Sequence, residues 1–307
     1  MHIRFSASMK TCVSNMAQPD ANRLPLISVI VRTKNRPFVL HTALRSIKEQ
    51  NYPNIETVVV EDGIHSSETV IKSFQDIPDI RYFHLHGDFG RSVAANVALD
   101  QAQGKYIAFL DDDDGYYPNH IATLYQAICQ SNAHVAYSLA NEVPSRLVRA
   151  DGSFRTKRSC VVFHQDFNLL ELLYRNYLPI QSVLFDRYAL AGNRFDENME
   201  LLEDWDFWIR MALKVRFWLV EEITSFYRVP FSCRMNRSRF AKMKQAEMYL
   251  RDKLKTYVVD TTAYNLALDY PLSNPEQWKT RFKRKYPRLY RTLKNVYLLM
   301  YTPKKSH

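Results

Sequence analysis

Short apolar runs alternate with longer amphipathic segments along the first half of the chain. These apolar runs predict strands at residues 27–31, 55–60, 80–85 and 106–110, of which the β-branched first and the apolar fourth are expected to be buried. Between these runs, apolar positions recur at helical spacing from Pro37 to about residue 47 and at about 91–102, which predicts two amphipathic helices. A polar helix is predicted at about 66–75. Strand–helix alternation at this spacing is typical of βαβ units, so we expect a mostly parallel sheet flanked by helices.

The second half of the chain continues the alternation less regularly. It predicts a helix at about 118–131, a strand at 134–139, a hairpin within 141–165 around Asp151-Gly152, a helix at about 166–175 and a strand at 181–185. A helix then follows Glu203 and Asp204, and two closing strands are expected at 217–220 and 223–228. The N-terminal residues 1–24 are polar and patternless, so we expect them to be loose.

Three of the predicted strands end in polar clusters. Thr33 and Arg36 follow the first strand, Asp62 follows the second, and four consecutive carboxylates, Asp111 to Asp114, follow the fourth. The carboxyl ends of parallel strands share one edge of the sheet, where ligands bind in such folds. Adjacent carboxylates repel one another by several kcal/mol near a protein surface unless a cation is close. The run therefore favours a divalent cation, Mn²⁺ or Mg²⁺, together with substrate phosphates, over an acidic solvated turn.

Composition excludes several classes of protein. The chain has 307 residues, 46% of them hydrophobic, so it can bury a substantial core and is neither disordered nor collagen-like. Its four cysteines lack metal-type or CxxC spacing and fit reduced thiols better than a disulfide framework. The N-terminus lacks the apolar core of a signal peptide, and no apolar run is long enough to cross a membrane. We expect a soluble, cytoplasmic protein.

The net charge of +10 is concentrated at the C-terminal end. Residues 234–307 carry 18 Lys and Arg against 5 Asp and Glu, a net of +13, so the first 233 residues have a net charge of −3. Residues 279–307 combine a basic stripe with apolar positions at helical spacing, which suits binding to an anionic membrane surface. The alternative is a final helix that packs its apolar face on the core. Nucleic-acid binding is not expected, because no motif of that class accompanies the charge.

Four segments in order resemble those of family 2 glycosyltransferases, inverting enzymes with the GT-A fold that use nucleotide-activated sugars. Their sequences are Ser28-Val-Ile-Val-Arg-Thr-Lys-Asn-Arg-Pro37, Val60-Glu-Asp-Gly63, Gly90-Arg-Ser-Val-Ala-Ala-Asn96 with Gly104 to Asp114, and Leu202-Glu-Asp-Trp-Asp-Phe-Trp-Ile-Arg210. The resemblance covers residues 26 to about 228. It implies a Rossmann-like GT-A domain at 25–233, divided into a nucleotide-binding half (25–115) and an acceptor half (116–233), with a basic helical extension at 234–307.

The resemblance also implies a role for each matching residue. The residues expected at the nucleotide are Thr33, Arg36, Asp62, Arg91, Asp111 and Asp112. Asp62 would accept from the base, and Asp112 would contact the ribose. Asp113 would bind the metal, with Asp111 assisting either neighbour. Asp204 would be the general base, with Glu203 as the second choice.

Plain structural roles remain open for several of these residues. Arg91 can form a surface ion pair, Thr33 can cap the following helix, and the acids at 203–204 can complement a helix dipole. Trp205 is more readily a core residue than a platform for an acceptor sugar. The sequence departs from the family at Pro230, close to where many relatives carry a metal-binding His.

The predicted reaction is metal-dependent transfer of a sugar, with inversion, from a UDP-sugar to a hydroxyl of a glycan or lipid-linked glycan. A membrane-peripheral location would follow from the basic tail. A nucleotidyltransferase is the alternative enzyme, but no Gly-rich phosphate loop follows the first strand. A catalytically silent module that binds a sugar nucleotide or a membrane is the alternative outside enzymes.

Overall fold

The computed structural model describes residues 24–74, 76–77, 79–148, 153–230 and 237–254. The chain divides into two compact units, residues 1–267 and 268–307, and the second lies wholly outside the described residues. The expectations for residues 1–23 and for the basic segment 279–307 therefore fall outside the described part of the chain.

The first half of the chain forms the parallel part of a twisted sheet. Its strands are β1 (Ile27–Thr33), β2 (Ile55–Glu61), β3 (Ile80–His84) and β4 (Tyr106–Asp111). They lie in the order β3-β2-β1-β4, and every neighbouring pair is parallel. All seven residues of both β1 and β2 are buried, as their β-branched composition requires of strands covered on both faces. The predicted parallel sheet is confirmed.

The second half extends the same sheet. Strand β9 (Val183–Asp186) runs antiparallel between β4 and β6 (Val135–Leu147). Strand β10 (Phe217–Pro230) is parallel to β6, and the two-residue strand β5 (Gly115–Tyr116) closes the edge. Because β9 is antiparallel to both β4 and β6, those two strands point the same way, and β10, which is parallel to β6, does so too. Their carboxyl ends therefore lie at the same edge as Asp111.

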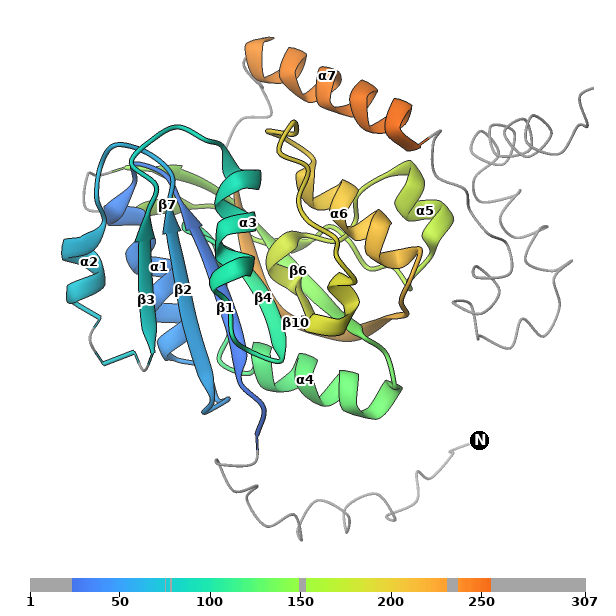
Figure 1. The fold of residues 1–307 in the computed structure, drawn as a ribbon, viewed down its shortest axis with the longest axis horizontal. Coiled ribbons are helices and arrows are strands. Elements are labelled where there is room, and N and C mark those ends of the chain that lie inside the picture. Colours follow the sequence, from blue (N-terminus) through green and yellow to red (C-terminus); the bar gives the residue numbers. More distant parts are fainter. Residues whose placement is uncertain (1–23, 75, 78, 149–152, 231–236, 255–307) are drawn as a thin grey trace, which may run out of the picture. The chain divides into compact units, whose positions relative to one another are not determined.

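Helices cover both faces of the sheet (Figure 1). One apolar layer lies under α1 (Pro37–Lys48), α2 (Glu68–Lys72) and α4 (His120–Ser131). The other lies under α3 (Arg91–Gln101), α5 (Leu169–Tyr174), α6 (Glu203–Ala212) and α7 (Arg237–Leu254). Short 3₁₀ turns at Ile180–Ser182 and Arg187–Leu190 flank β9.

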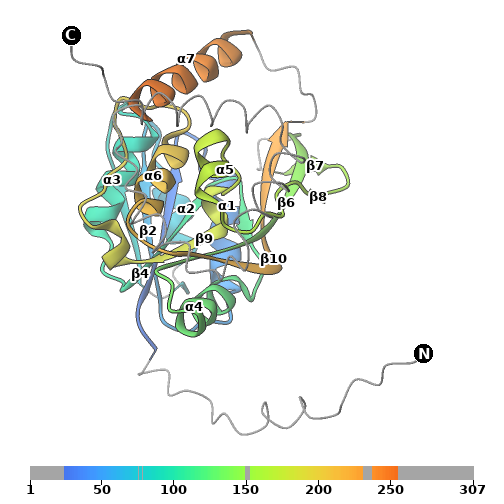
Figure 2. The same cartoon turned by 90° about the vertical axis from the view of Figure 1, so that its right-hand side faces the viewer.

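The structure corrects two of the predicted elements and contains the predicted hairpin. The predicted strands 217–220 and 223–228 are one strand, β10, whose register against β6 shifts between Val220 and Ser225. The polar helix expected at 66–75 is limited to the five residues of α2. The predicted hairpin is present as β6, β7 (Phe154–Thr156) and β8 (Cys160–Val161), although Asp151-Gly152 lies outside the described residues. Figure 2 shows β7 and β8 beside the far ends of β6 and β10.

None of the helices within residues 24–254 that the structure describes combines the length and the apolar character needed to cross a membrane.

Helix α7 packs on the core, although it belongs to the segment 234–307 that was expected to form a separate basic extension. Leu250 is fully buried in the same apolar layer as α3 and α6. Two ion pairs join α7 to the loop before α6, Lys242 with Glu200 and Lys253 with Asp196. The helix is thus attached both by apolar burial and by charge.

Replacement of Leu250 by alanine tests this attachment. Removing a fully buried leucine side chain is expected to lower the free energy of unfolding by about 2–4 kcal/mol, because it leaves a cavity. Met248 lies two residues away on the same helix but is 64% exposed, so Met248→Ala is the matched control, expected within about 0.5 kcal/mol of the parent chain. Urea unfolding measures both. Equal stabilities for the two variants would show that α7 contributes nothing to the core.

Candidate active site

A buried arginine joins the two acidic segments of the site. Arg32 lies near the carboxyl end of β1, directly opposite Asp111 in the β1–β4 register. Its Nε and Nη2 donate to Asp111 Oδ1 at 2.9 and 2.6 Å, and its Nη1 donates to Glu203 Oε1 at 3.0 Å. The side chain is only 5% exposed. Burial alone would lower the pKa of Arg32, but the two carboxylates more than offset this effect and raise it.

Asp112 is held by polar side chains from the loop after β1. Thr33 Oγ1 donates to Asp112 Oδ2 at 2.7 Å, and the Arg36 guanidinium forms an ion pair with the same carboxyl group. Thr33 does not cap α1, whose first flanking residue is Arg36, so the capping alternative for Thr33 is wrong. Burial of Asp112 raises its pKa to about 7, although the charge of Arg36 works against this rise.

Asp113 is the more open carboxylate of the pair 112–113. Its side chain is 29% exposed, against 1% for Asp112, and Arg36 Nη1 contacts Asp113 Oδ2 at 3.2 Å. A divalent cation held by one protein carboxylate takes its other ligands from water and phosphate oxygens. Among the described residues, no three His, Cys, Asp or Glu side chains converge as a preformed metal site. The donor set around Asp113 fits a cation that arrives with a diphosphate.

Asp114 points into the protein rather than toward the cleft. It accepts a hydrogen bond from the backbone N–H of Arg228 at 2.9 Å, and the Arg228 guanidinium donates to the carbonyl oxygen of Asp113. Burial, together with the charges of Asp113 and Asp111, raises the pKa of Asp114 well above its ordinary value. Arg228 precedes Pro230 by two residues, so the segment that departs from the family pattern still supports the acidic run.

Asp62 fixes the loop that begins α3. Its two carboxyl oxygens accept from the backbone N–H groups of Phe89 and Gly90 at 2.7 and 3.0 Å, and Lys34 Nζ lies 3.4 Å from it. This carboxylate thereby holds the loop that places Arg91 at the start of α3. The Arg91 side chain is 47% exposed and lies 3.6 Å from Glu203 Oε1. Arg91 therefore forms the ion pair that was considered as its alternative role, and it also lines the cleft.

The acids at the start of α6 have different surroundings. Leu202, which precedes them, has a φ of 62°, an unfavourable left-handed conformation for a branched side chain. Glu203 is buried and paired with Arg32. Asp204 accepts from Asn176 Nδ2 at 3.0 Å and from the Trp205 backbone N–H at 2.8 Å. Burial and then the negative charge of Glu203 raise the pKa of Asp204 to about 7.

Trp205 is a core residue. Its side chain is buried, and its indole N–H donates to the carbonyl oxygen of Leu172 on α5. The expectation that this tryptophan packs in the core, rather than against an acceptor sugar, agrees with these contacts.

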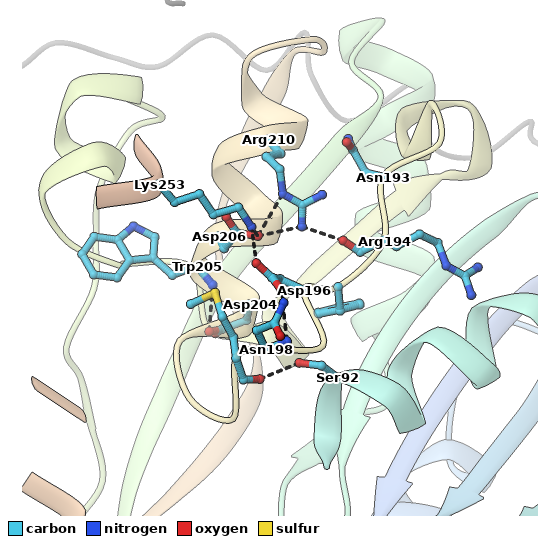
Figure 3. Close-up of polar contacts among 12 residues, drawn as sticks. Ser92, Asn193, Arg194, Asp196, Asn198, Asp204, Trp205, Asp206, Arg210 and Lys253 are labelled. Atoms are coloured by element: carbon cyan, nitrogen blue, oxygen red, sulfur yellow. Dashed lines mark hydrogen bonds and ion pairs between the residues drawn. The ribbon is translucent and has the colours of Figure 1, made fainter. Parts of the chain in front are cut away.

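The loop before α6 is held in place by polar contacts to three elements (Figure 3). Ser92 on α3 donates to the carbonyl oxygen of Met199 at 2.7 Å. Lys253 on α7 bridges Asp196 of the loop and Asp206 of α6, at 2.6 and 3.0 Å. Arg210 also pairs with Asp206, so this fully buried carboxylate has two cationic partners. The loop forms one wall of the cleft and is thus rigidly tied to the helix that carries Asp204.

These groups surround a cleft of about 420 Å³ at the carboxyl edge of the sheet. Of the nucleotide-binding residues expected from the sequence, all six line it: Thr33, Arg36, Asp62, Arg91, Asp111 and Asp112. The wall also includes three residues of the loop before α6 and Lys242 of α7. Asp113 and Asp204 are not among the lining residues, although each directly neighbours one that is or one that pairs with Arg32, namely Asp112 and Glu203.

Sequence reasoning missed four functional candidates. They are Arg32, Lys34, Asn176 and Arg228. Arg32 carried a usable signal, because a charged residue at the end of a fully apolar strand requires a buried partner. Asn176 and Arg228 carried no such signal, because they contact Asp204 and Asp113, which are 28 and 115 positions away in the sequence.

Comparisons with known proteins show which family the chain resembles. Residues 28–163 match the model of Glycosyl transferase family 2. The chain is 27% identical over 208 residues to WcaA of Escherichia coli K12, named as a glycosyl transferase of colanic acid biosynthesis, covering 67% of this chain and 73% of WcaA. It is also 27% identical over 205 residues to the Campylobacter jejuni GalNAc(5)-diNAcBac-PP-undecaprenol beta-1,3-glucosyltransferase, covering 62% of this chain and 64% of that protein.

Solved structures support the fold. TarS 1–349 of S. aureus in complex with UDP-GlcNAc superposes with a TM-score of 0.60 at 17% identity, covering 86% of this chain and 78% of that one. The mannosyltransferase PcManGT from Pyrobaculum calidifontis, in complex with GDP-Man and Mn²⁺, gives 0.58 at 16% identity, covering 81% and 71%. Together these comparisons show that the chain is similar to family 2 glycosyltransferases and that it shares the GT-A fold of TarS and PcManGT.

Proposed function

We propose that this chain transfers a sugar from a UDP-sugar to a hydroxyl group of a glycan or lipid-linked glycan, with inversion and with Mn²⁺ or Mg²⁺. The observation that carries the proposal is the placement of two different carboxylates about one buried arginine. Asp113 is partly open to solvent next to Asp112, whereas Asp204 adjoins Glu203, the partner of Arg32, and its pKa is raised to about 7 by burial and by the charge of Glu203. One carboxylate suits a metal, and the other suits a general base at neutral pH.

The residues divide the reaction between them. Arg36 and Arg91 would neutralise the diphosphate, and Asp113 would hold the cation that stabilises the departing nucleoside diphosphate. Asp204 would take the proton from the acceptor hydroxyl as the oxygen attacks the anomeric carbon. A single displacement without a covalent intermediate inverts that carbon. Asn176, hydrogen-bonded to Asp204, would orient the base.

The donor and the acceptor are proposed from the relatives. UDP-GlcNAc is bound in the TarS complex and GDP-Man in the PcManGT complex, so a nucleoside diphosphate sugar fits this fold. We favour UDP because the family resemblance implies that Asp62 accepts a hydrogen bond from the base, which would be uracil. The acceptor class follows the name of the Campylobacter jejuni relative, which includes an undecaprenyl diphosphate. The basic segment 279–307 would bind the anionic membrane in which such an acceptor resides.

Calorimetric titration with UDP, dTDP and GDP, with Mn²⁺ and again with a chelator, tests the donor site. UDP is expected to bind only with the metal, and Asp113→Asn is expected to weaken metal-dependent binding at least about tenfold, or about 1.4 kcal/mol. Asp76→Asn is the matched control, because Asp76 is exposed and pairs with Lys48. Unchanged UDP affinity in Asp113→Asn would remove that residue from the metal site. Preference for GDP or dTDP would refute the role of Asp62.

Asp204→Asn is expected to retain UDP binding and to lower the transfer rate by about 10²–10⁴-fold, because an amide cannot accept the proton. Asp100→Asn, an exposed carboxylate paired with Arg194, is the control. Donor turnover assays measure both. Normal turnover in Asp204→Asn would assign the base elsewhere. UDP binding without any transfer or hydrolysis by the parent chain would support a silent sugar-nucleotide module instead.

The pH profile tests the environment of Asp204. A base must be ionised, and the raised pKa means that activity should fall as the pH drops through about 7. Glu203→Gln removes the neighbouring negative charge, so the midpoint of the profile is expected to move to lower pH. A parent profile that stays flat down to about pH 4, the ordinary range of an aspartate, would contradict the assignment.

A further inference from the structure

One aromatic ring lies in the wall of the cleft. Phe89, in the loop between β3 and α3, lines the cleft and is 56% exposed. No other aromatic side chain is among the described residues that line it, and most of the remaining lining residues are charged or polar. A single exposed apolar side chain on an open surface needs no explanation. Inside a charged cleft, however, such a ring is an apolar surface that a ligand made of phosphates alone cannot cover.

The loop that carries this ring is fixed at two points. Asp62 accepts from the backbone N–H of Phe89 at 2.7 Å and from that of Gly90 at 3.0 Å. On the other side of Phe89 in the chain, Gly87 forms an antiparallel bridge with Gly63, the residue that follows Asp62. The backbone therefore holds the ring in place before any ligand binds. A ligand that covers the ring has little ordering cost to overcome.

Gly87 makes room for the ring. A Cβ atom at this position would lie 2.4 Å from Cε2 of Phe89 and 2.8 Å from its Cζ. A normal contact between carbon atoms is roughly 3.5–4.0 Å. The φ of Gly87 lies outside the left-handed region, so the backbone conformation does not by itself require glycine here. The ring of Phe89 is what excludes a side chain at residue 87.

Cations lie in the same wall as the ring. Arg91 follows Phe89 by two residues, at the start of α3, and Lys34 and Arg36 line the cleft from the loop after β1. A flat apolar ring beside cations suits a ligand that combines a planar heterocycle with a diphosphate. Aromatic side chains bind such heterocycles through the π face. Each carboxylate oxygen has two lone pairs, so Asp62 can hold the loop and still accept from the edge of a base.

We propose that the base of the nucleotide donor stacks on the ring of Phe89, which Gly87 and Asp62 hold in position. The inference rests on the proposed function, because it takes a nucleoside diphosphate as the ligand of the cleft. Stacking supplies affinity that the charged residues of the cleft do not. Because every base has a π face, the ring strengthens binding without selecting uracil, and selection among bases is left to hydrogen bonds at the edge of the base.

Replacement of Phe89 by alanine tests the stacking. Calorimetry with Mg²⁺ measures the affinity for UDP and for inorganic pyrophosphate, which carries phosphates but no base. Phe89→Ala is expected to weaken UDP binding by between about fivefold and a hundredfold and to leave pyrophosphate binding unchanged. Phe89→Tyr keeps a ring and is expected to bind UDP as the parent chain does. Tyr188→Ala is the matched control, because this aromatic side chain is 74% exposed but does not line the cleft.

Gly87→Ala is a second, independent variant. Its methyl group would displace the ring, so the affinity for UDP is expected to fall at least about threefold. In a chain that also carries Phe89→Ala, the same substitution is expected to have no further effect, because the ring that it displaces is absent. An equal loss of affinity in both backgrounds would show that Gly87 acts through the loop backbone, and its proposed role toward the ring would be wrong.

Two results with Phe89→Ala would overturn the proposal. Unchanged affinity for UDP, in a parent chain that binds UDP, would show that the ring does not contact the base, and it would leave the proposed function intact. Equal weakening of UDP and pyrophosphate binding would show that Phe89 only supports the loop. A parent chain that binds none of UDP, dTDP and GDP would instead refute the proposed donor site, and this inference with it.

Discussion

The buried guanidinium of Arg32 is the interaction on which the site depends. It joins Asp111 at the end of β4 to Glu203 at the start of α6, two groups that are 92 positions apart in the chain, from 111 to 203. A buried arginine without its partners would cost several kcal/mol, so both carboxylates must be in place when the fold is complete. The carboxyl edge of the sheet and the helix that carries Asp204 are thereby held in one geometry.

The same logic explains how four adjacent carboxylates are tolerated. Each has a different environment: Asp111 pairs with Arg32, Asp112 with Thr33 and Arg36, and Asp114 accepts from the backbone of Arg228. Asp113 is left open to the solvent on one side. The raised pKa values of Asp112 and Asp114 show that these partners do not fully offset the burial of negative charge. A divalent cation beside Asp113 would supply the missing positive charge, which supports the proposed metal dependence.

Helix α7 links the basic end of the chain to the cleft. Lys253 bridges the loop before α6 and Asp206 within α6, while Lys242 lies in the wall of the cleft beside Glu200. Some of the Lys residues that follow residue 233 therefore form ion pairs within the protein and are not available to bind an external anion.

The sequence by itself determined the α/β class, the parallel strands, the acidic run and the resemblance to family 2 glycosyltransferases, because these depend on short-range periodicity and on local motifs. It placed Thr33, Arg36, Asp62 and the run Asp111 to Asp114 at one edge for a physical reason, namely that parallel strands end together, whereas Arg91 came only from the family resemblance. Only the tertiary structure decided which carboxylate is open to solvent, which is paired with a cation and which has its pKa raised to about 7. Those properties depend on partners such as Arg32, Asn176 and Arg228, which long-range packing brings to the site and which no local pattern reveals.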